Sequence, residues 1–346
     1  MHVAGPLLDV AGLSVAFATE AGSVLAVDRL SFAVAPGELL ALVGESGCGK
    51  SVTALAVMGL LDRRIASVGG RVALDGVDLL TLPSGELAAR RGRHMAMVFQ
   101  EPMSSLNPVM SIGRQIVEPL RRHLGLDARA ARERAVDLLD LVRIPDPRRR
   151  IDDYPHQLSG GMRQRVMIAM ALAAEPRLLI ADEPTTALDV TVQAQILDLI
   201  QDLRQRLGLA VLLITHDLGV VAETADRVIV MYAGRKAEEA GVHALFARPS
   251  HPYTLGLLRS MPPARRRHGL RVERLAEIPG AVPRLQGSAV GCTFAARCAY
   301  AQQECVDAVP EETIIGPNHM ARCFVAAARR PEEIAAHYQR RVGAVS

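Results

Sequence analysis

A glycine-rich segment, GESGCGKS at residues 44–51, contains the residue types that bind a nucleotide phosphate. It follows a continuous apolar run and precedes a helical pattern, which is the context expected of a phosphate-binding loop. Its glycines let backbone N–H groups face the phosphates, and the helix N-terminus adds a favourable dipole. We expect Lys50 to reach the β- and γ-phosphates and the Ser51 hydroxyl to ligate Mg²⁺. The residues expected to contact the nucleotide here are Gly44, Glu45, Ser46, Gly47, Cys48, Gly49, Lys50, Ser51 and Val52.

Two adjacent acids end another apolar run, RLLIADEP at 177–184. At the carboxyl end of a strand, Asp182 suits the shell of Mg²⁺, which retains water and takes few carboxylates. Glu183 can then polarise the attacking water as a general base. A helix-capping cluster is the alternative interpretation of this pair, and the phosphate-binding loop upstream favours the hydrolytic one.

The segment LSGGMRQ at 158–164 places a serine and two glycines at the start of a helical pattern. This is a second anion-binding helix N-terminus in the same chain. A single nucleotide needs only one phosphate-binding loop, so the second has a role if it caps the γ-phosphate held by another subunit. The residues expected to make that contact are Ser159, Gly160, Gly161 and Gln164.

Taken in order over about residues 7–260, these motifs resemble those of the nucleotide-binding subunit of an ABC transporter. The resemblance implies a head-to-tail dimer, with each ATP between the phosphate-binding loop of one subunit and the LSGGMRQ of the other. It implies that Phe17 stacks on adenine, although a plain core position is the alternative for this residue. It also implies that Gln100 senses Mg²⁺ and faces the membrane subunits, and that Asp189 lies at the dimer seam. His216 would contact the γ-phosphate, against the alternative of a buried histidine at a strand end.

These assignments define the predicted chemistry of an ATPase. The catalytic residues are predicted to be Glu183, His216, Gln100 and Lys50. The Mg²⁺ ligands are predicted to be Ser51, Gln100 and Asp182.

Four further features resemble the dipeptide/oligopeptide/nickel importer ATPases: FQEPMSSLNP at 99–108, HPYT at 251–254, IPGAVP at 278–283 and a cysteine-rich tail. This resemblance implies an ATP-hydrolysing motor subunit on the cytoplasmic face of a bacterial inner membrane. It implies two membrane-spanning permeases, a second ATPase subunit that is a sister chain, and an extracytoplasmic binding protein. Nickel, glutathione or another solute is the alternative to a peptide as cargo. An exporter ATPase, or a soluble ABC ATPase acting on nucleic acid or ribosomes, is the contrasting class.

Four of the five cysteines lie in the tail, at Cys292, Cys298, Cys305 and Cys323. The N-terminal residues lack the pattern of a signal peptide, so we expect a reducing cytoplasm, which argues against disulfides. Four thiolates suit either tetrahedral Zn²⁺ or a [4Fe–4S] cluster. Because the spacings are wider than those of paired zinc knuckles, we predict a [4Fe–4S] cluster that staples the tail, with zinc or no metal as the alternatives.

The elements that must position these residues indicate an α/β protein. Apolar runs at 39–44, 94–100, 177–182, 210–216 and 226–234 predict parallel strands, and GRVALDGVDL at 70–79 predicts a hairpin. We predict a P-loop NTPase core, with a RecA-like parallel sheet plus an antiparallel β subdomain. An all-helical ABC insertion and a small cysteine-containing C-terminal module complete the prediction. The predicted ATPase domain is 1–250, with a helical signature subdomain at about 101–175, and the C-terminal module is 251–346.

Bulk properties exclude other classes. The net charge is only +3, and arginine clusters such as those at 148–150 and 265–267 have no interleaved aromatic residues, so nucleic-acid binding is not expected. No run approaches the roughly 18 apolar residues of a membrane-spanning helix. Lysine occurs only at Lys50 and Lys236 against many arginines, so each lysine is a candidate for a role that needs a compact ammonium group.

Overall fold

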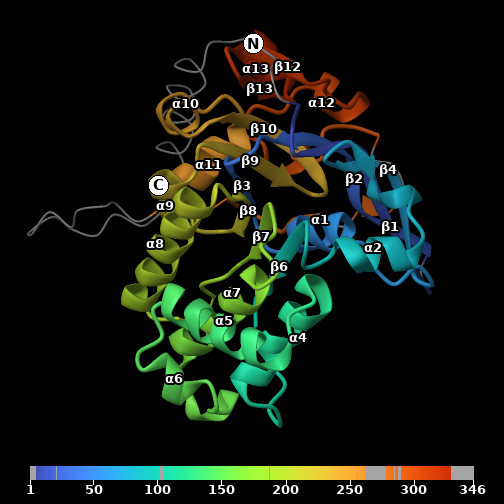
Figure 1. The fold of residues 1–346 in the computed structure, drawn as a ribbon. Helices are drawn as coiled ribbons and strands as arrows, with labels where there is room; N and C mark the ends of the chain where they lie inside the picture. Colours follow the sequence, from blue (N-terminus) through green and yellow to red (C-terminus); the bar gives the residue numbers. More distant parts are fainter. Residues whose placement is uncertain are drawn as a thin grey trace, which may run out of the picture.

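The computed structural model describes residues 5–20, 22–101, 105–186, 188–261, 278–283, 285–286 and 290–328. Two sheets form the upper half of the molecule, and a group of helices lies below them (Figure 1). The arginine cluster predicted at 265–267 lies outside the described residues, whereas Arg148 and Arg149 are exposed. None of the described helices has the length and apolar character needed to span a bilayer.

The larger sheet has mixed topology, in the order β12-β13-β10-β9-β3-β8-β7-β6. Its parallel part pairs β6 with β7, β7 with β8, β8 with β3 and β3 with β9. The strands are β3 (Leu39–Val43), β6 (Met95–Val98), β7 (Leu178–Asp182), β8 (Ala210–Thr215), β9 (Arg227–Tyr232), β10 (Arg235–Gly241), β12 (Thr313–Gly316) and β13 (His319–Ala321). Every residue of β3, β7 and β8 is buried, as expected for parallel strands covered on both faces. The predicted parallel α/β core is confirmed.

The second sheet is antiparallel, in the order β11-β2-β1-β4-β5. Its strands are β1 (Leu8–Thr19), β2 (Gly22–Val34), β4 (Ala66–Leu74), β5 (Val77–Asp78) and β11 (Leu285–Gln286). Between β4 and β5, Asp75 and Gly76 have φ values of 52° and 80°, the positive angles that a two-residue hairpin turn requires. The hairpin predicted at 70–79 is therefore present.

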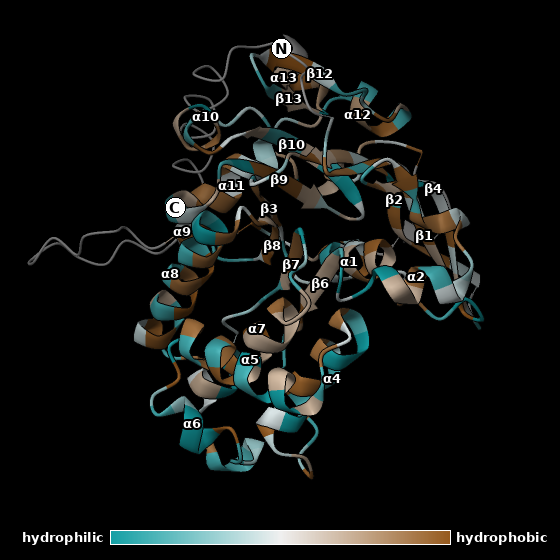
Figure 2. Cartoon of the chain, viewed as in Figure 1, coloured by the Kyte–Doolittle hydropathy of each residue, from teal (hydrophilic) through white to brown (hydrophobic). Residues whose placement is uncertain are grey.

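Helices lie beside and below these sheets, and most of them carry both hydrophobic and hydrophilic residues along their length (Figure 2). Those near the sheets are α1 (Lys50–Met58), α2 (Ser84–Arg90), α8 (Val190–Leu207), α9 (Leu218–Thr224), α10 (Val242–Ala247) and α11 (Pro252–Arg259). The lower group comprises α4 (Ile112–Leu124), α5 (Ala128–Leu141), α6 (Pro147–Arg150) and α7 (Gly160–Leu172). Two short helices, α12 (Gln303–Asp307) and α13 (Phe324–Ala328), belong to the C-terminal module.

Residues of the predicted C-terminal module (251–346) extend the core sheet. The weak periodicity of this segment did not predict that pairing. Strand β13 pairs with β10 through Glu238–Ala321 and two neighbouring pairs, and β12 pairs with β13. The module is thus continuous with the sheet that carries the phosphate-binding loop.

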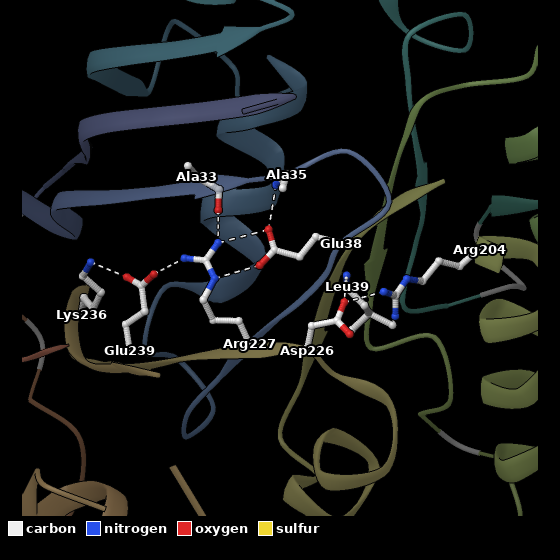
Figure 3. A network of polar contacts seen from close by, with 9 residues as sticks. All are labelled: Ala33, Ala35, Glu38, Leu39, Arg204, Asp226, Arg227, Lys236 and Glu239. Carbon is white, nitrogen blue, oxygen red and sulfur yellow. Dashed lines mark hydrogen bonds and ion pairs between the residues drawn. The ribbon is translucent and has the colours of Figure 1, made fainter. Parts of the chain in front are cut away.

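A network of charges joins the strands near this junction; Lys236 and Glu239 are buried in it, and Arg227 and Glu38 are half-buried (Figure 3). Arg227 bridges the carboxylates of Glu38 and Glu239. The Nζ atom of Lys236 lies 2.6 Å from Glu239 and also 2.6 Å from Glu312 of the C-terminal module. The Lys236 ammonium therefore fills the role of a compact charge shared by two acids.

Candidate nucleotide-hydrolysing site

The phosphate-binding loop connects β3 to α1, where close backbone approaches require glycine. Gly44 has a φ of 154°, and a Cβ atom there would lie 2.3 Å from the carbonyl oxygen of Met231. Gly49, the N-cap of α1, has a φ of 104°, and its Cβ would lie 2.4 Å from the carbonyl oxygen of Ala26. The loop conformation therefore depends on these two glycines.

Two polar side chains at the end of the loop are held by hydrogen bonds: Lys50 by the loop itself and Ser51 by the end of β7. Lys50 is buried and donates hydrogen bonds to the carbonyl oxygens of Gly44 (2.8 Å) and Glu45 (3.1 Å). The Ser51 hydroxyl donates to Oδ1 of Asp182 at 3.0 Å. Burial raises the pKa of Asp182, and the hydrogen bond from Ser51 partly offsets this. The adjacent hydroxyl and carboxylate oxygens fit the donor set of Mg²⁺.

Glu183 follows β7 with a φ of 44°, a left-handed conformation that is uncommon outside glycine and recurs at functional sites. Its carboxylate accepts hydrogen bonds from Gln100 Nε2 (3.0 Å) and the Thr186 hydroxyl (2.9 Å), and His216 Nδ1 lies 3.3 Å away. Burial raises the pKa of Glu183, but the contacts with Thr186 and His216 outweigh it and leave the pKa below its ordinary value. Glu183 is therefore held as a carboxylate, the form that a general base requires.

A single pocket brings most of these segments together, although they are far apart in the sequence. It lies at the carboxyl ends of the parallel strands, where ligands bind in open α/β sheets. Its lining comprises Ala26, Ser46, Gly47, Gly49, Lys50, Ser51, Val52, Gln100, Glu183 and His216. The arrangement can bind a polyphosphate and activate water against it.

Comparisons with known proteins agree with this site. The ABC transporter family model matches residues 27–186, and the model of the oligopeptide/dipeptide transporter C-terminal region matches residues 237–305. A Brucella melitensis protein named as a peptide import ATP-binding protein is 53% identical over 318 residues, 92% of this chain and 94% of its own. This chain belongs to the ABC transporter ATP-binding subunits. A Sinorhizobium fredii protein named as a peptide ABC transporter ATP-binding protein is 54% identical over 319 residues, with the same coverage of both chains.

Solved structures give the same family. The dimeric ATP-binding cassette MJ0796, in a post-hydrolysis state bound to ADP and phosphate, has a TM-score of 0.62 and 27% identity. That match covers 68% of this chain and 98% of the cassette. CbiO1 from Clostridium perfringens, part of the ABC transporter complex cbiONQ, has a TM-score of 0.60 and 28% identity over 70% of this chain and 91% of its own. The predicted ABC ATPase fold and ATPase activity are confirmed, and ATP and Mg²⁺ are the cofactors expected of the family.

The signature segment of this ABC ATPase lies away from its own pocket. Ser159 caps α7 by accepting a hydrogen bond from the Met162 N–H at 3.4 Å. A Cβ on Gly161 would lie 2.6 Å from Val192 on α8, so glycine allows the two helices to approach here. Gln164 is buried in α7, and Asp189 caps α8 through the Val192 N–H at 3.0 Å. None of Ser159, Gly160, Gly161, Gln164 and Asp189 lines the pocket around Lys50.

Five other predicted contact residues also lie outside the pocket lining, and one of them, Asp182, still contacts the lining residue Ser51. Phe17 is half-buried on β1 and packs against the apolar cluster that lies between the two sheets and α1. Cys48 is fully buried, as expected of a small loop residue, and burial raises the pKa of its thiol. Gly44 and Glu45 form the start of the loop without lining the pocket. The adenine-stacking role of Phe17 stays a prediction.

The four tail cysteines lie in one region but do not form a ligand set. All are free thiols, and burial raises the pKa of Cys298 to about 12 and that of Cys323 to about 11, with smaller contributions from the neighbouring thiols. Burial also raises the pKa of Cys292. Among the described residues, no group of three or more His, Cys, Asp or Glu side chains is arranged to hold a metal ion. The predicted [4Fe–4S] cluster therefore has no support from the described geometry.

Sequence reasoning missed Thr186, whose hydroxyl donates to Glu183. The signal was present, because a hydroxyl three residues after an acid in EPTT can reach back to it across a tight turn.

Proposed function

We propose that this chain is the ATP-hydrolysing motor subunit of an importer for di- or oligopeptides. The observation that carries the proposal is the gathering of Lys50, Ser51, Gln100, Glu183 and His216 around one pocket. The peptide cargo is supported by the names of the Brucella and Sinorhizobium relatives and by the match of residues 237–305 to the oligopeptide/dipeptide C-terminal region. Nickel, glutathione or another solute is the alternative cargo for the same motor.

Within this proposal, each residue has a separate role. Lys50 and the loop glycines bind the β- and γ-phosphates. Ser51, Asp182 and Gln100 are the residues that would hold Mg²⁺, and the ion would supply positive charge against the phosphates. Glu183 accepts the proton of the attacking water, and the Thr186 hydroxyl helps to lower the pKa of Glu183, which favours its ionised form. His216, close to Glu183, contacts the γ-phosphate.

The second half of each site comes from another subunit. The separation of Ser159 and its glycines from the pocket of their own chain supports this arrangement. The dimeric MJ0796 cassette supports it as well. Whether the neighbour is a sister chain or an identical one decides whether both sites of the dimer are equivalent.

Membrane permeases are the proposed mechanical partners. A groove along α4 is lined by Met110, Arg114, Val117, Glu118, Arg121, Arg122, Gly125 and Leu126. Val109 beside it is 78% exposed, and Phe99, next to Gln100, is 39% exposed. A surface that combines exposed apolar groups with charges suits a cytoplasmic loop of a permease, which would place this chain peripherally on the inner membrane.

Co-expression with two polytopic permeases tests the assembly. We expect the chain to co-purify with them, to show feeble ATPase activity alone, and to drive ATP-dependent uptake of labelled peptides into proteoliposomes. A fully active, stable monomer in detergent-free buffer would contradict the two-subunit site. Uptake of labelled nickel or glutathione in place of peptides would select the alternative cargo.

The tail metal is a separate proposal that rests on residue types alone. Cys292, Cys298, Cys305 and Cys323 have the donor chemistry for a [4Fe–4S] cluster or zinc, with a structural role. Anaerobic purification with metal analysis tests it: the cluster predicts brown protein with about four irons per chain, lost in Cys298→Ser. Colourless protein with stoichiometric zinc would select zinc, and protein without either metal would leave four structural thiols.

A further inference from the structure

Three segments that the ATP site does not use are connected by hydrogen bonds to one residue of the phosphate-binding loop, two of them directly and IPGAVP through Arg297. These are HPYT (251–254), IPGAVP (278–283) and the first part of the cysteine-rich tail (291–298). The Tyr253 hydroxyl accepts a hydrogen bond from the Glu45 N–H at 2.9 Å. Nη1 of Arg297 donates to both carboxylate oxygens of Glu45, at 3.1 and 3.0 Å. The backbone and the side chain of Glu45 are thus both held from the C-terminal module.

Arg297 is itself fixed before it reaches the loop. Its Nε donates to the carbonyl oxygen of Pro279 at 2.7 Å, and Nη2 donates to that of Ile278 at 3.0 Å. Nη1 also donates to the Tyr232 hydroxyl at 3.2 Å. Only 7% of the Arg297 side chain is exposed. A planar guanidinium can make these contacts together, whereas an ammonium cannot.

An aromatic cluster supports Tyr253 in the same way. The Tyr253 ring is fully buried and lies 4.7 Å from Tyr232, at the end of β9, and 5.3 Å from Phe294 of the cysteine-rich segment. Phe294 also lies 5.1 Å from Tyr232, and both contacts have tilted or edge-on geometry, as aromatic pairs prefer. The hydroxyl that reaches Glu45 is therefore carried by a packed ring.

Glu45 needs such support for two physical reasons. The neighbouring glycines permit many backbone conformations, so the loop geometry must be stabilised by contacts from outside. The carboxylate also belongs to a loop that receives a polyphosphate, and without a counter-charge it repels that ligand.

We propose that Arg297 and Tyr253 are positioning residues for ATP binding: they brace the phosphate-binding loop through Glu45, and Arg297 neutralises the Glu45 carboxylate. The C-terminal module then contributes to the nucleotide site through these two side chains. This inference rests on ATP binding at the loop, as in the proposed function.

The proposal is tested by measuring the affinity of the full-length chain for a fluorescent MgATP analogue by titration, and its affinity for MgATP by competition. Arg297→Ala is expected to weaken binding about tenfold, the effect of losing a charge-assisted hydrogen-bonded contact. Adding Glu45→Gln to Arg297→Ala should restore most of the affinity, because it removes the unpaired carboxylate. Arg297→Lys should give an intermediate value, since it returns the charge without the fork.

Glu312→Gln is the matched control. It weakens the 2.6 Å ion pair between the C-terminal module and Lys236, whose ammonium group contacts Glu239 and the Ser31 carbonyl oxygen rather than Glu45. We expect its affinity for MgATP to stay within about twofold of the wild type, a change below 0.5 kcal/mol. Tyr253→Phe removes only a hydroxyl and keeps the packed ring, so it tests the brace even if Arg297→Ala fails to fold; about threefold weaker binding is expected.

Unchanged affinity in Arg297→Ala and Tyr253→Phe would overturn the brace. Equal losses in Arg297→Ala and Glu312→Gln would also overturn it, because they would indicate general loosening of the module. Failure of the wild-type chain itself to bind MgATP would instead contradict the proposed function.

Discussion

The catalytic pocket and the C-terminal module differ in how far apart in the sequence their contacting residues lie. Lys50 hydrogen-bonds carbonyl groups five and six residues away, inside one continuous motif. Tyr253 and Arg297 reach Glu45 across 208 and 252 residues. The contacts of a short motif follow from the spacing of its residues in the sequence. The contacts of the module form only when segments distant in the sequence come together in the fold.

The two lysines of the chain illustrate this difference, because one contacts its own motif and the other contacts a distant segment. Lys50 is buried against the loop carbonyls, and Lys236 is buried between Glu239 and Glu312. One serves the ligand and the other joins the module to the core. Substituting each should therefore change a different measured quantity.

Lys50→Ala should have the largest effect on nucleotide binding. Removing the phosphate-directed ammonium is expected to weaken MgATP binding about a hundredfold while leaving thermal unfolding of the free chain nearly unchanged. Lys50→Arg should recover little, because the planar guanidinium does not replace a compact ammonium in a tight loop. Binding at wild-type affinity in Lys50→Ala would remove the loop from the site.

Lys236→Met should lower the free energy of unfolding rather than the affinity for MgATP. It removes the cation that Glu239 and Glu312 share and leaves Glu239 paired with Arg227 alone, and we expect a loss of about 2 kcal/mol in the free energy of unfolding. Denaturant titration measures this loss, with exposed Arg64→Met as a control that should unfold like the wild type. An unchanged midpoint for Lys236→Met would show that the module is not joined to the core by this contact.

Thr186→Val should produce a smaller change, visible in the pH dependence of hydrolysis. The Thr186 hydroxyl helps hold the pKa of Glu183 below its ordinary value, so its removal raises that pKa. The general base must be ionised, and the acidic limb of the kcat profile should therefore move to higher pH. Thr81→Val, far from the pocket, should leave the profile in place, and an unshifted limb in Thr186→Val would exclude the proposed tuning.

The sequence predicted the elements whose patterns are local. In each case a window of about ten residues was enough to predict the structure. These elements are the buried runs of β3, β7 and β8, the Asp75–Gly76 turn and the glycines of the phosphate-binding loop. Pairing between distant segments was not predictable: β12 and β13 are short, and they join the sheet through β10. The position of Arg297 over Glu45 could not be predicted either, since neither neighbourhood carries a periodic signal for the other.

The tail cysteines mark the limit of reasoning from residue types. The right residue types for a metal site are present at Cys292, Cys298, Cys305 and Cys323. Residue type alone does not determine whether the four sulfur atoms surround one position where an ion could bind. Among the described residues no such arrangement occurs. Arg297, between two of these cysteines, has the better-defined contacts.

Hydrolysis by Glu183→Gln in the assembled transporter tests the central claim most directly. The carboxamide keeps the shape of Glu183 but cannot accept the proton of water, so MgATP binding should be retained while turnover falls by about 10²–10⁴-fold. Glu133→Gln, an exposed acid paired with Arg148, is the matched control and should hydrolyse ATP normally. Hydrolysis by Glu183→Gln at the native rate would contradict the assignment of the general base and the mechanism built on it.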